Sequence, residues 1–337
     1  MPNTHSLTLP PKLRDNKVVE DEGSPSRDVL IFFISGNPGL IGYYEPFLST
    51  LRTLLDETNL LRNARFQIYG QNLAGFSDDD HEPFTTDRKP HSLEYQIQHT
   101  LTVLKQLRIE SGPRRGLPYD DILLIGHSVG GYITLELFHR LLRDPSLAPH
   151  VHLTSGILLF PTIHHISSSP SGWKLNLLRK TPILGDNAYR IAQTILRLCP
   201  HNALHWLVRR VLGFSAHGVE TTTRWLKSRD GVWQALHMGM DEMKVIGEER
   251  WGNELWEIAH EAEAHDREIP TFFFFFGKND HWVANEHRDG FIKRQKHSKR
   301  TRLIVDEGCI PHAFCIHHSE IMAEKVKAWI LEMYGAS

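Results

Sequence analysis

The stretch that decides the fold is residues 121–130, Asp-Ile-Leu-Leu-Ile-Gly-His-Ser-Val-Gly. Its first half is a short apolar run, typical of a strand that is buried on both faces of a sheet. The second half is a Gly-x-Ser-x-Gly motif, and from Gly130 to about Leu142 apolar residues recur at helical spacing. A strand, a serine at a sharp turn and a helix together indicate a nucleophile elbow, so we expect Ser128 to be a nucleophile.

Steric crowding explains why this motif needs glycine on both sides of the serine. A serine at the tip of so sharp a turn has a strained backbone, and side chains two residues before and after it would clash. Gly126 and Gly130 remove that clash. The helix that follows directs its positive end toward the serine, and we expect the backbone N–H of Val129 to donate a hydrogen bond to an oxyanion.

Strands and helices alternate on both sides of the motif. This alternation predicts an α/β protein with a mostly parallel, doubly wound sheet. The expected strands cover residues 29–34, 66–70, 121–125 and 155–160, and the expected helices between them cover residues 44–55, 92–109 and 130–142.

The pattern changes after the fourth strand. From about residue 163 to 266 the sequence has helical periodicity and no convincing strand. Strands return at residues 271–276 and 302–305, and a closing helix is expected at 321–333. We therefore predict one α/β-hydrolase domain over residues 29–337, with a helical cap inserted at about 163–266. Residues 1–28 are polar and are expected to form a flexible tail.

A serine hydroxyl needs a base, and in this fold the partners follow in the order serine, acid, histidine. Asp280 comes just after the strand at 271–276 and is the acid we expect. His312 lies in the loop after the last strand and is the expected base. Alternatives remain at each position: Asp289, Asp306 and Glu307 for the acid, and His317 and His318, which we expect to begin the closing helix, for the base.

A second oxyanion donor is expected in the loop after the first strand. The loop reads Gly36-Asn37-Pro38-Gly39, and Pro38 has no backbone N–H. We expect the N–H of Asn37 to be the donor, with Gly39 or Leu40 as alternatives. This chemistry requires neither a metal nor an organic cofactor, and the His164-His165 and His317-His318 pairs lack a carboxylate or cysteine spaced to complete a metal site.

The composition excludes several classes of protein. The chain has 337 residues, 40% of them hydrophobic, and a formal net charge of -2, which does not favour a nucleic-acid partner. Three cysteines match no zinc pattern and favour a reducing compartment. The N-terminus lacks the apolar stretch of a signal peptide, and no apolar run is long enough for an ordinary transmembrane helix. We expect a protein that is not secreted.

One part of the predicted cap combines basic and apolar residues. Between residues 173 and 214, lysines and arginines alternate with leucines, isoleucines and tryptophans, and Asp186 is the sole acidic residue. This combination suits a helix that lies on a phospholipid surface. It equally suits a cap whose apolar face covers the active site and whose basic face is solvated. Both interpretations stay open, and they are compatible.

With these residues placed, the sequence resembles the lipid droplet-associated hydrolase family from about residue 29 onward. The resemblance lies in residues 35–40 with Tyr43, Tyr44 and Phe47, in residues 126–132, in Leu-Phe-Pro-Thr-Ile at 159–163 followed by Ser-Pro-Ser-Gly at 169–172, and in Pro-His-Ala-Phe-Cys at 311–315. It implies a Ser128-Asp280-His312 triad that acts on lipid esters, including sterol esters. It also implies association with lipid droplets and the cytosolic face of the endoplasmic reticulum. The alternatives are a droplet-binding protein with little catalysis and an acyltransferase on the same fold.

Overall fold

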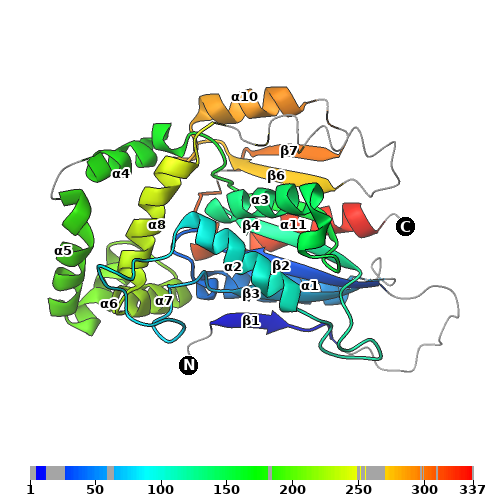
Figure 1. Cartoon of the computed structure of the whole chain (residues 1–337), viewed down its shortest axis with the longest axis horizontal. Helices are drawn as coiled ribbons and strands as arrows, with labels where there is room; N and C mark the ends of the chain where they lie inside the picture. The colour runs from blue at the N-terminus through cyan, green and yellow to red at the C-terminus, as the bar shows by residue number, and fades with distance from the viewer. Residues whose placement is uncertain are drawn as a thin grey trace, which may run out of the picture.

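The fold is built around one seven-stranded sheet, in the order β1-β3-β2-β4-β5-β6-β7 (Figure 1). The computed structural model describes residues 5–12, 27–58, 64–180, 184–248, 251, 255, 270–296, 298, 300–308 and 310–335. The strands are β1 Ser6–Leu9, β2 Arg27–Ile34, β3 Ala64–Gln71, β4 Asp121–His127, β5 Leu153–Leu159, β6 Thr271–Gly277 and β7 Thr301–Asp306. All neighbours pair in parallel except β1 and β3.

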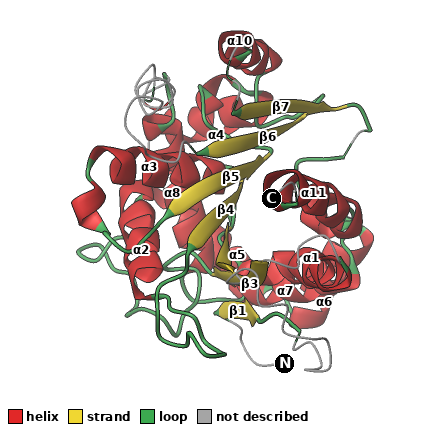
Figure 2. Ribbon diagram, turned by 90° about the vertical axis from the view of Figure 1, so that its right-hand side faces the viewer, coloured by secondary structure: helices red, strands yellow, loops and turns green. Residues whose placement is uncertain are grey.

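Helices cover both faces of the sheet, as the alternating sequence pattern predicts. Helices α1 (Glu45–Glu57) and α11 (Ser319–Tyr334) lie together on one face, and α2 (Leu93–Gln106) and α3 (Val129–Arg143) lie on the other (Figure 2). The side chain of Ser92 caps α2 by accepting a hydrogen bond from the Tyr95 N–H. The expected α/β-hydrolase fold with a mostly parallel, doubly wound sheet is therefore confirmed.

Strand β6 shows how the consecutive phenylalanines are accommodated. Side chains alternate between the faces of a strand, so successive rings enter different layers. Phe274 and Phe276 contact Phe291 of α10 (Asn285–Gln295), a helix that the sequence analysis did not anticipate. Phe273 and Phe275 contact Trp329 of α11 on the opposite face. Burial on both faces explains why this strand carries no alternation of polar and apolar residues.

The cap is inserted between β5 and β6, as expected. Its described helices are α4 Pro170–Lys180, α5 Leu184–Leu198, α6 His201–Arg210, α7 Ala216–Leu226 and α8 Gly231–Val245. They gather beyond one end of the sheet, on the left in Figure 1. The predicted end of the cap, near residue 266, lies outside the described residues. No helix in the described part of the chain combines the length and apolar character needed to cross a bilayer.

Two local predictions are corrected by the structure. The expected flexible tail contains β1, whose Leu7 and Leu9 pack on the core while its backbone pairs with β3. A four-residue edge strand depends on that pairing, which a polar local composition does not reveal. The rest of the expected tail lies outside the described residues, except residues 5, 10–12 and 27–28. The closing helix starts at Ser319, so His317 and His318 precede it, with His318 at its N-cap.

Candidate active site

The backbone around Ser128 is strained in the way that the motif predicts. Ser128 joins β4 to α3 with φ 55° and ψ −123°, a region that non-glycine residues rarely adopt. A Cβ atom on Gly126 would lie 2.3 Å from the carbonyl oxygen of Gly130, and one on Gly130 would lie 2.3 Å from that of Ile34. Only glycine fits at either position, and the turn presents Ser128 to a cavity.

Three side chains from distant parts of the sequence meet at this turn. His312 Nε2 lies 3.0 Å from Ser128 Oγ, and His312 Nδ1 lies 2.7 Å from Asp280 Oδ2. Asp280 follows β6 and His312 follows β7, so the parallel strand order brings both to the same edge as the serine. Because a carboxylate only accepts, Nδ1–H donates to Asp280 and Nε2 is left to accept the serine hydroxyl.

The charge on Asp280 is favoured by its contacts. Burial by itself raises the pKa of this carboxyl, since only 8% of the residue is exposed. The hydrogen bond and charge attraction from His312 and the N–H of Trp282, at 2.8 Å, outweigh burial and lower the pKa below its usual value. The carboxylate therefore stays ionised and holds the imidazole in one orientation.

The alternative candidates have other contacts. Asp306 Oδ2 accepts the Ile310 N–H at 2.7 Å and so shapes the loop that carries His312. Asp289 pairs with the neighbouring Arg288 at 2.8 Å. His317 Nε2 lies 2.7 Å from the carbonyl oxygen of Gly213. None of these three forms a hydrogen bond with the Ser128–His312 pair, whereas Asp280 does.

A hydrogen-bonded support behind Ser128 was missed by the sequence analysis. The Gly36 N–H donates to the Tyr44 hydroxyl at 3.2 Å, and that hydroxyl lies 2.7 Å from His127 Nδ1. His127 Nε2 lies 2.9 Å from the carbonyl oxygen of His312. Burial lowers the pKa of His127 to about 3, so its neutral ring accepts from Tyr44 and donates to His312. The only sequence signal was a histidine inside the serine motif.

The two expected oxyanion donors belong to the start of α3 and to the loop after β2. Val129 begins α3, and Asn37 follows the end of β2 by three residues. Within the described chain, neither backbone N–H donates to a neighbouring loop. The Leu40 N–H, one of the alternatives, donates to the Pro38 carbonyl at 2.9 Å. The Asn37 side chain is held by the carbonyl of Ala235 and by Glu242, each at 3.0 Å.

Ser128 and His312 open into a cavity of about 370 Å³. Its walls come from the sheet edge, from the loop around Asn37 and from the cap. Most of the lining is apolar, which suits a hydrocarbon chain. Leu212 and Phe214, which follow α6, reach the cavity, and Leu212 is also 54% exposed on the surface. The apolar surface of the cap is therefore continuous with the cavity beside Ser128.

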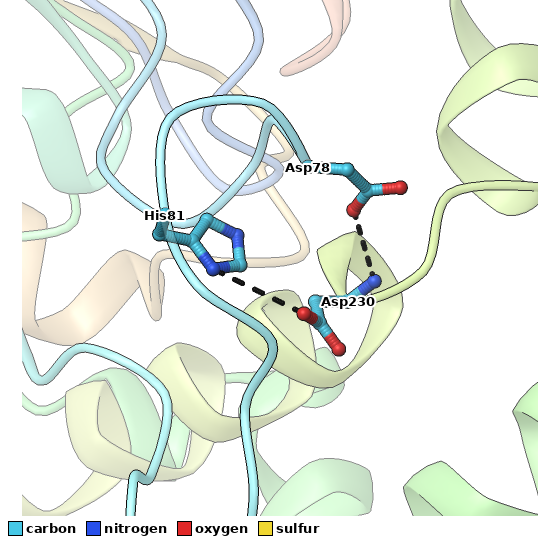
Figure 3. Close-up of side chains that lie close together, drawn as sticks. All are labelled: Asp78, His81 and Asp230. Atoms are coloured by element: carbon cyan, nitrogen blue, oxygen red, sulfur yellow. Dashed lines mark hydrogen bonds and ion pairs between the residues drawn. The ribbon is translucent and has the colours of Figure 1, made fainter.

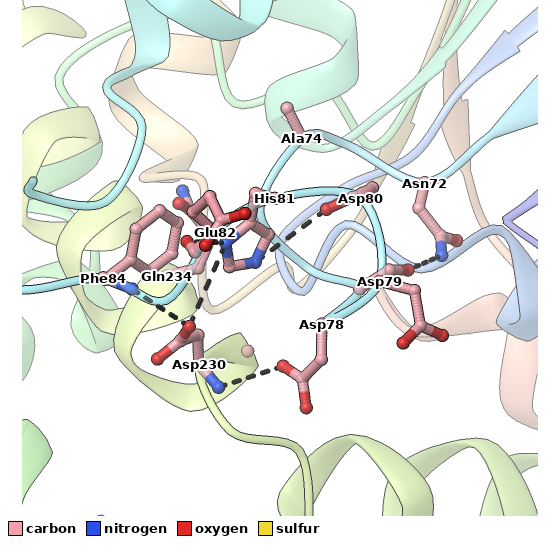
Figure 4. Close-up of polar contacts among 12 residues, drawn as sticks. Asn72, Ala74, Asp78, Asp79, Asp80, His81, Glu82, Phe84, Asp230 and Gln234 are labelled. Carbon is pink, nitrogen blue, oxygen red and sulfur yellow. Dashed lines mark hydrogen bonds and ion pairs between the residues drawn. The ribbon is translucent and has the colours of Figure 1, made fainter.

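A second polar cluster joins the cap to the main domain outside this cavity. Asp78, His81 and Asp230 have ligand-type atoms within 4.8 Å of one another, a grouping that could hold a metal ion (Figure 3). The two carboxylates already have partners: Asp78 accepts the backbone N–H groups of Arg229 and Asp230. Asp230 accepts the Phe84 N–H (Figure 4) and also pairs with Arg229. The Arg229 guanidinium supplies positive charge to this cluster, which fastens the start of α8 to the loop after β3.

Comparison with known proteins places this geometry in a family context. A family model described as "Lipid-droplet associated hydrolase" matches residues 27–315. The chain is 27% identical to the lipid droplet-associated hydrolase of Mus musculus, covering 92% of this chain and 86% of the relative. It is 28% identical to that of Homo sapiens, with 91% and 86% covered.

Solved structures resemble the chain in fold. A peroxisomal alpha-beta-hydrolase from Saccharomyces cerevisiae superposes with a TM-score of 0.59 at 13% identity, covering 98% of this chain and 89% of the other. A loop variant of a haloalkane dehalogenase from Bradyrhizobium elkanii gives a TM-score of 0.53 at 14% identity, covering 94% and 92%. At such low identities these likenesses establish the α/β-hydrolase fold alone.

Proposed function

The chain belongs to the lipid-droplet associated hydrolase family, and from that premise we propose that it is a serine hydrolase of lipid carboxylic esters. In this proposal Ser128 is the nucleophile, His312 the base and Asp280 the acid that orients the base. The observation that carries it is the row of two hydrogen bonds, 3.0 Å and 2.7 Å, from Ser128 through His312 to Asp280. A serine activated in this way attacks carbonyl carbon.

The reaction follows from the contacts of these groups. His312 takes the Ser128 proton as Oγ attacks the ester carbonyl, and then gives that proton to the departing alcohol. Water, deprotonated by the same imidazole, releases the acid from the acyl-enzyme. Asp280 keeps the imidazole in the required tautomer and stabilises its cation. His127 and Tyr44 support the backbone of His312 and the loop of Asn37, and so help to keep the geometry.

The oxyanion is proposed to accept hydrogen bonds from the Val129 and Asn37 N–H groups. Donors that are fixed before the reaction stabilise charge as it develops, and each is worth about 3 kcal/mol in the transition state. The Asn37 side chain is anchored to α8 through Ala235 and Glu242, so the loop that carries its N–H is held by the cap.

The place of action is proposed to be a lipid droplet surface, with the endoplasmic reticulum membrane, on its cytosolic face, as a second location. Nine of the thirteen exposed large hydrophobic side chains in the described chain fall between residues 173 and 212. Exposed basic residues Lys174, Arg197, Arg209 and Arg210 lie among them. This combination suits binding to a phospholipid monolayer, because the apolar side chains can insert between the lipids while the basic side chains contact the head groups. The substrates proposed are acylglycerols or sterol esters.

The same surface favours one alternative function. A protein that binds droplets and organises them with little catalysis would also expose apolar side chains between residues 173 and 212. The two functions differ in their dependence on Ser128, because droplet binding does not need the serine hydroxyl.

The deciding experiment is labelling with a fluorophosphonate, followed by a panel of lipid esters presented on artificial droplets. We expect the wild-type protein to be labelled and to cleave esters, and Ser128→Ala to lose both while still binding droplets. If the wild-type protein is not labelled and cleaves no ester, the hydrolase proposal fails and the binding function stands. Products formed with added alcohol would separate hydrolysis from acyl transfer.

A further inference from the structure

The cavity beside Ser128 contains an acidic side chain that the proposed mechanism does not use. Glu242 lies on α8, is only 5% exposed and lines the same cavity as Ser128 and His312. Among the described residues it forms one side-chain hydrogen bond, in which its Oε1 accepts from Asn37 Nδ2 at 3.0 Å. It has no cationic partner there, and buried carboxyl groups without one are uncommon.

The surroundings of Glu242 favour its neutral form. Burial is the main reason that the pKa of Glu242 is raised from its usual 4.5 to about 8, and the nearby charge of Asp241 adds to the rise. The hydrogen bond from Asn37 opposes the rise without cancelling it. Because Oε1 accepts from Asn37, the proton belongs on Oε2, and no hydrogen bond of Oε2 is found among the described residues.

The hydroxyl groups that line the cavity have partners, whereas Trp225 Nε1, which is also buried, has none among the described residues. The hydroxyls of Tyr43 and Thr222 lie 2.8 Å apart, and Tyr44 is engaged by His127 at 2.7 Å. The neighbouring surface is formed by apolar residues such as Leu226, Met243 and Ile316. A hydrogen-bond donor set in such a wall selects a ligand that has an acceptor at that point, because a ligand without one leaves the donor unpaired.

We propose that Glu242 determines specificity by donating a hydrogen bond from its carboxylic acid to a second oxygen in the alcohol part of the ester. This inference rests on the proposed function. Glu242 contacts the loop of Asn37, so the oxygen it reaches lies close to the reacting carbonyl. An ordinary fatty acyl chain has only hydrocarbon there, whereas a glycerol ester has an oxygen on the next carbon of its alcohol part. The preferred substrates are thus esters of polyols, and esters of simple alcohols or sterols are poorer.

The test compares two esters with the same acyl chain. Monooleoylglycerol has two hydroxyls in its three-carbon alcohol, and propyl oleate has none. We expect the wild-type protein to prefer monooleoylglycerol in kcat/KM by about tenfold, the effect of one well-made hydrogen bond. Glu242→Leu removes the donor and is expected to abolish this preference. Glu242→Gln retains both an acceptor for Asn37 and an N–H donor, and is expected to keep most of it.

Matched controls separate this role from a structural one. Lys244→Gln changes an exposed residue on the same helix and should leave the ratio of the two kcat/KM values unchanged. If Glu242→Leu lowers both esters by the same factor, Glu242 only supports the Asn37 loop and the proposal is overturned. A wild-type protein with no preference, or a Glu242→Leu variant that keeps it, also overturns the proposal.

A binding measurement makes the test independent of catalysis. The ether analogues 1-O-oleylglycerol and oleyl propyl ether cannot be hydrolysed, and their dissociation constants can be measured on Ser128→Ala. We expect tighter binding of the glycerol ether, by about tenfold, and loss of that difference when Glu242→Leu is added. If labelling shows that Ser128 is unreactive but this difference is found, the hydrolase proposal fails while the Glu242 site stands. Equal binding of the two ethers rejects the site.

Discussion

Two parts of the cap differ in how they meet the rest of the protein. Helix α8 is fastened to the main domain along its length: Asp78 holds its start, Gln234 pairs with the backbone of His91, and Asp241 accepts the Leu93 N–H. The segment from residue 173 to 212, in contrast, directs many of its large apolar side chains to the surface. Both parts belong to one insertion between β5 and β6.

This difference indicates that one insertion can provide both a wall of the active site and a lipid-binding surface. A wall of the active site has to be positioned closely, since small displacements of groups around a reacting carbonyl cost rate. A lipid-binding surface needs exposed apolar area and little specific geometry. Helix α8 is positioned beside the site by directional hydrogen bonds. The segment from residue 173 to 212 instead exposes apolar side chains, whose contacts have no required direction. Variants in each part should therefore affect different measurements.

The largest effect is expected on catalysis, when the proposed acid of the active site is changed. Asp280→Asn removes the charge that orients His312, and we expect kcat to fall by about 10⁴-fold. Binding to droplets should be unchanged, because Asp280 is buried and lies outside the exposed segment 173–212. Steady-state kinetics and droplet flotation measure the two quantities. If kcat and droplet binding fell by the same factor, the active site and the exposed segment 173–212 would not act separately.

The next effect concerns the free energy of unfolding, which depends on the protonation of Glu242. As pH rises above 4.5, the unfolded chain ionises this carboxyl while the folded protein keeps it protonated until about pH 8. Its contribution to stability is therefore full below pH 4.5 and is lost between pH 4.5 and about 8. Glu242→Gln avoids the loss. We expect it to raise the free energy of unfolding at pH 7 by up to about 3 kcal/mol, since each pKa unit corresponds to about 1.4 kcal/mol.

Urea unfolding at several pH values measures this effect. The advantage of Glu242→Gln should shrink as the pH is lowered toward 4.5. A constant difference at all pH values would show that the substitution acts through packing and not through protonation.

A smaller effect, on droplet binding, is expected for substitutions in the exposed segment 173–212. Leu198→Asp and Trp206→Asp each place a charge on a side chain that is 79% or 59% exposed. Each should weaken droplet binding by about tenfold, the contribution of one large apolar side chain to membrane burial. Hydrolysis of a soluble short-chain ester should not change. Ile321→Asp on α11, with 53% exposure outside the cap, is the matched control and should leave flotation with droplets intact.

The smallest effect is expected where α8 is fastened. Asp78→Asn weakens the acceptors for the N–H groups of Arg229 and Asp230, and we expect a loss of about 1–2 kcal/mol in the free energy of unfolding. Hydrogen exchange should rise first at the start of α8. Asp79→Asn, whose side chain is 72% exposed, provides the comparison. If α8 exchanges at the same rate in both variants, the cluster does not fasten it.

The sequence predicted the sheet and its helices well because their signals are local. Apolar runs mark the buried strands, and Ser92 marks the start of α2. Strand β1 was missed because its partner β3 is more than fifty residues away. For the site, Ser128 has a local motif, whereas Asp280 and His312 are proposed from their places after strands, with rivals nearby.

By itself, the sequence determined the elbow around Ser128 and the order in which strands and helices follow, because glycine requirements and hydrophobic periods act over a few residues. Only the tertiary structure decided which side chains share the site. It joins His127 to Tyr44 and to the backbone of His312, and it brings Glu242 to Asn37 across 205 positions of sequence. The reason is physical: a hydrogen bond depends on distance and direction in space, and neither is written in the spacing of residues along a chain.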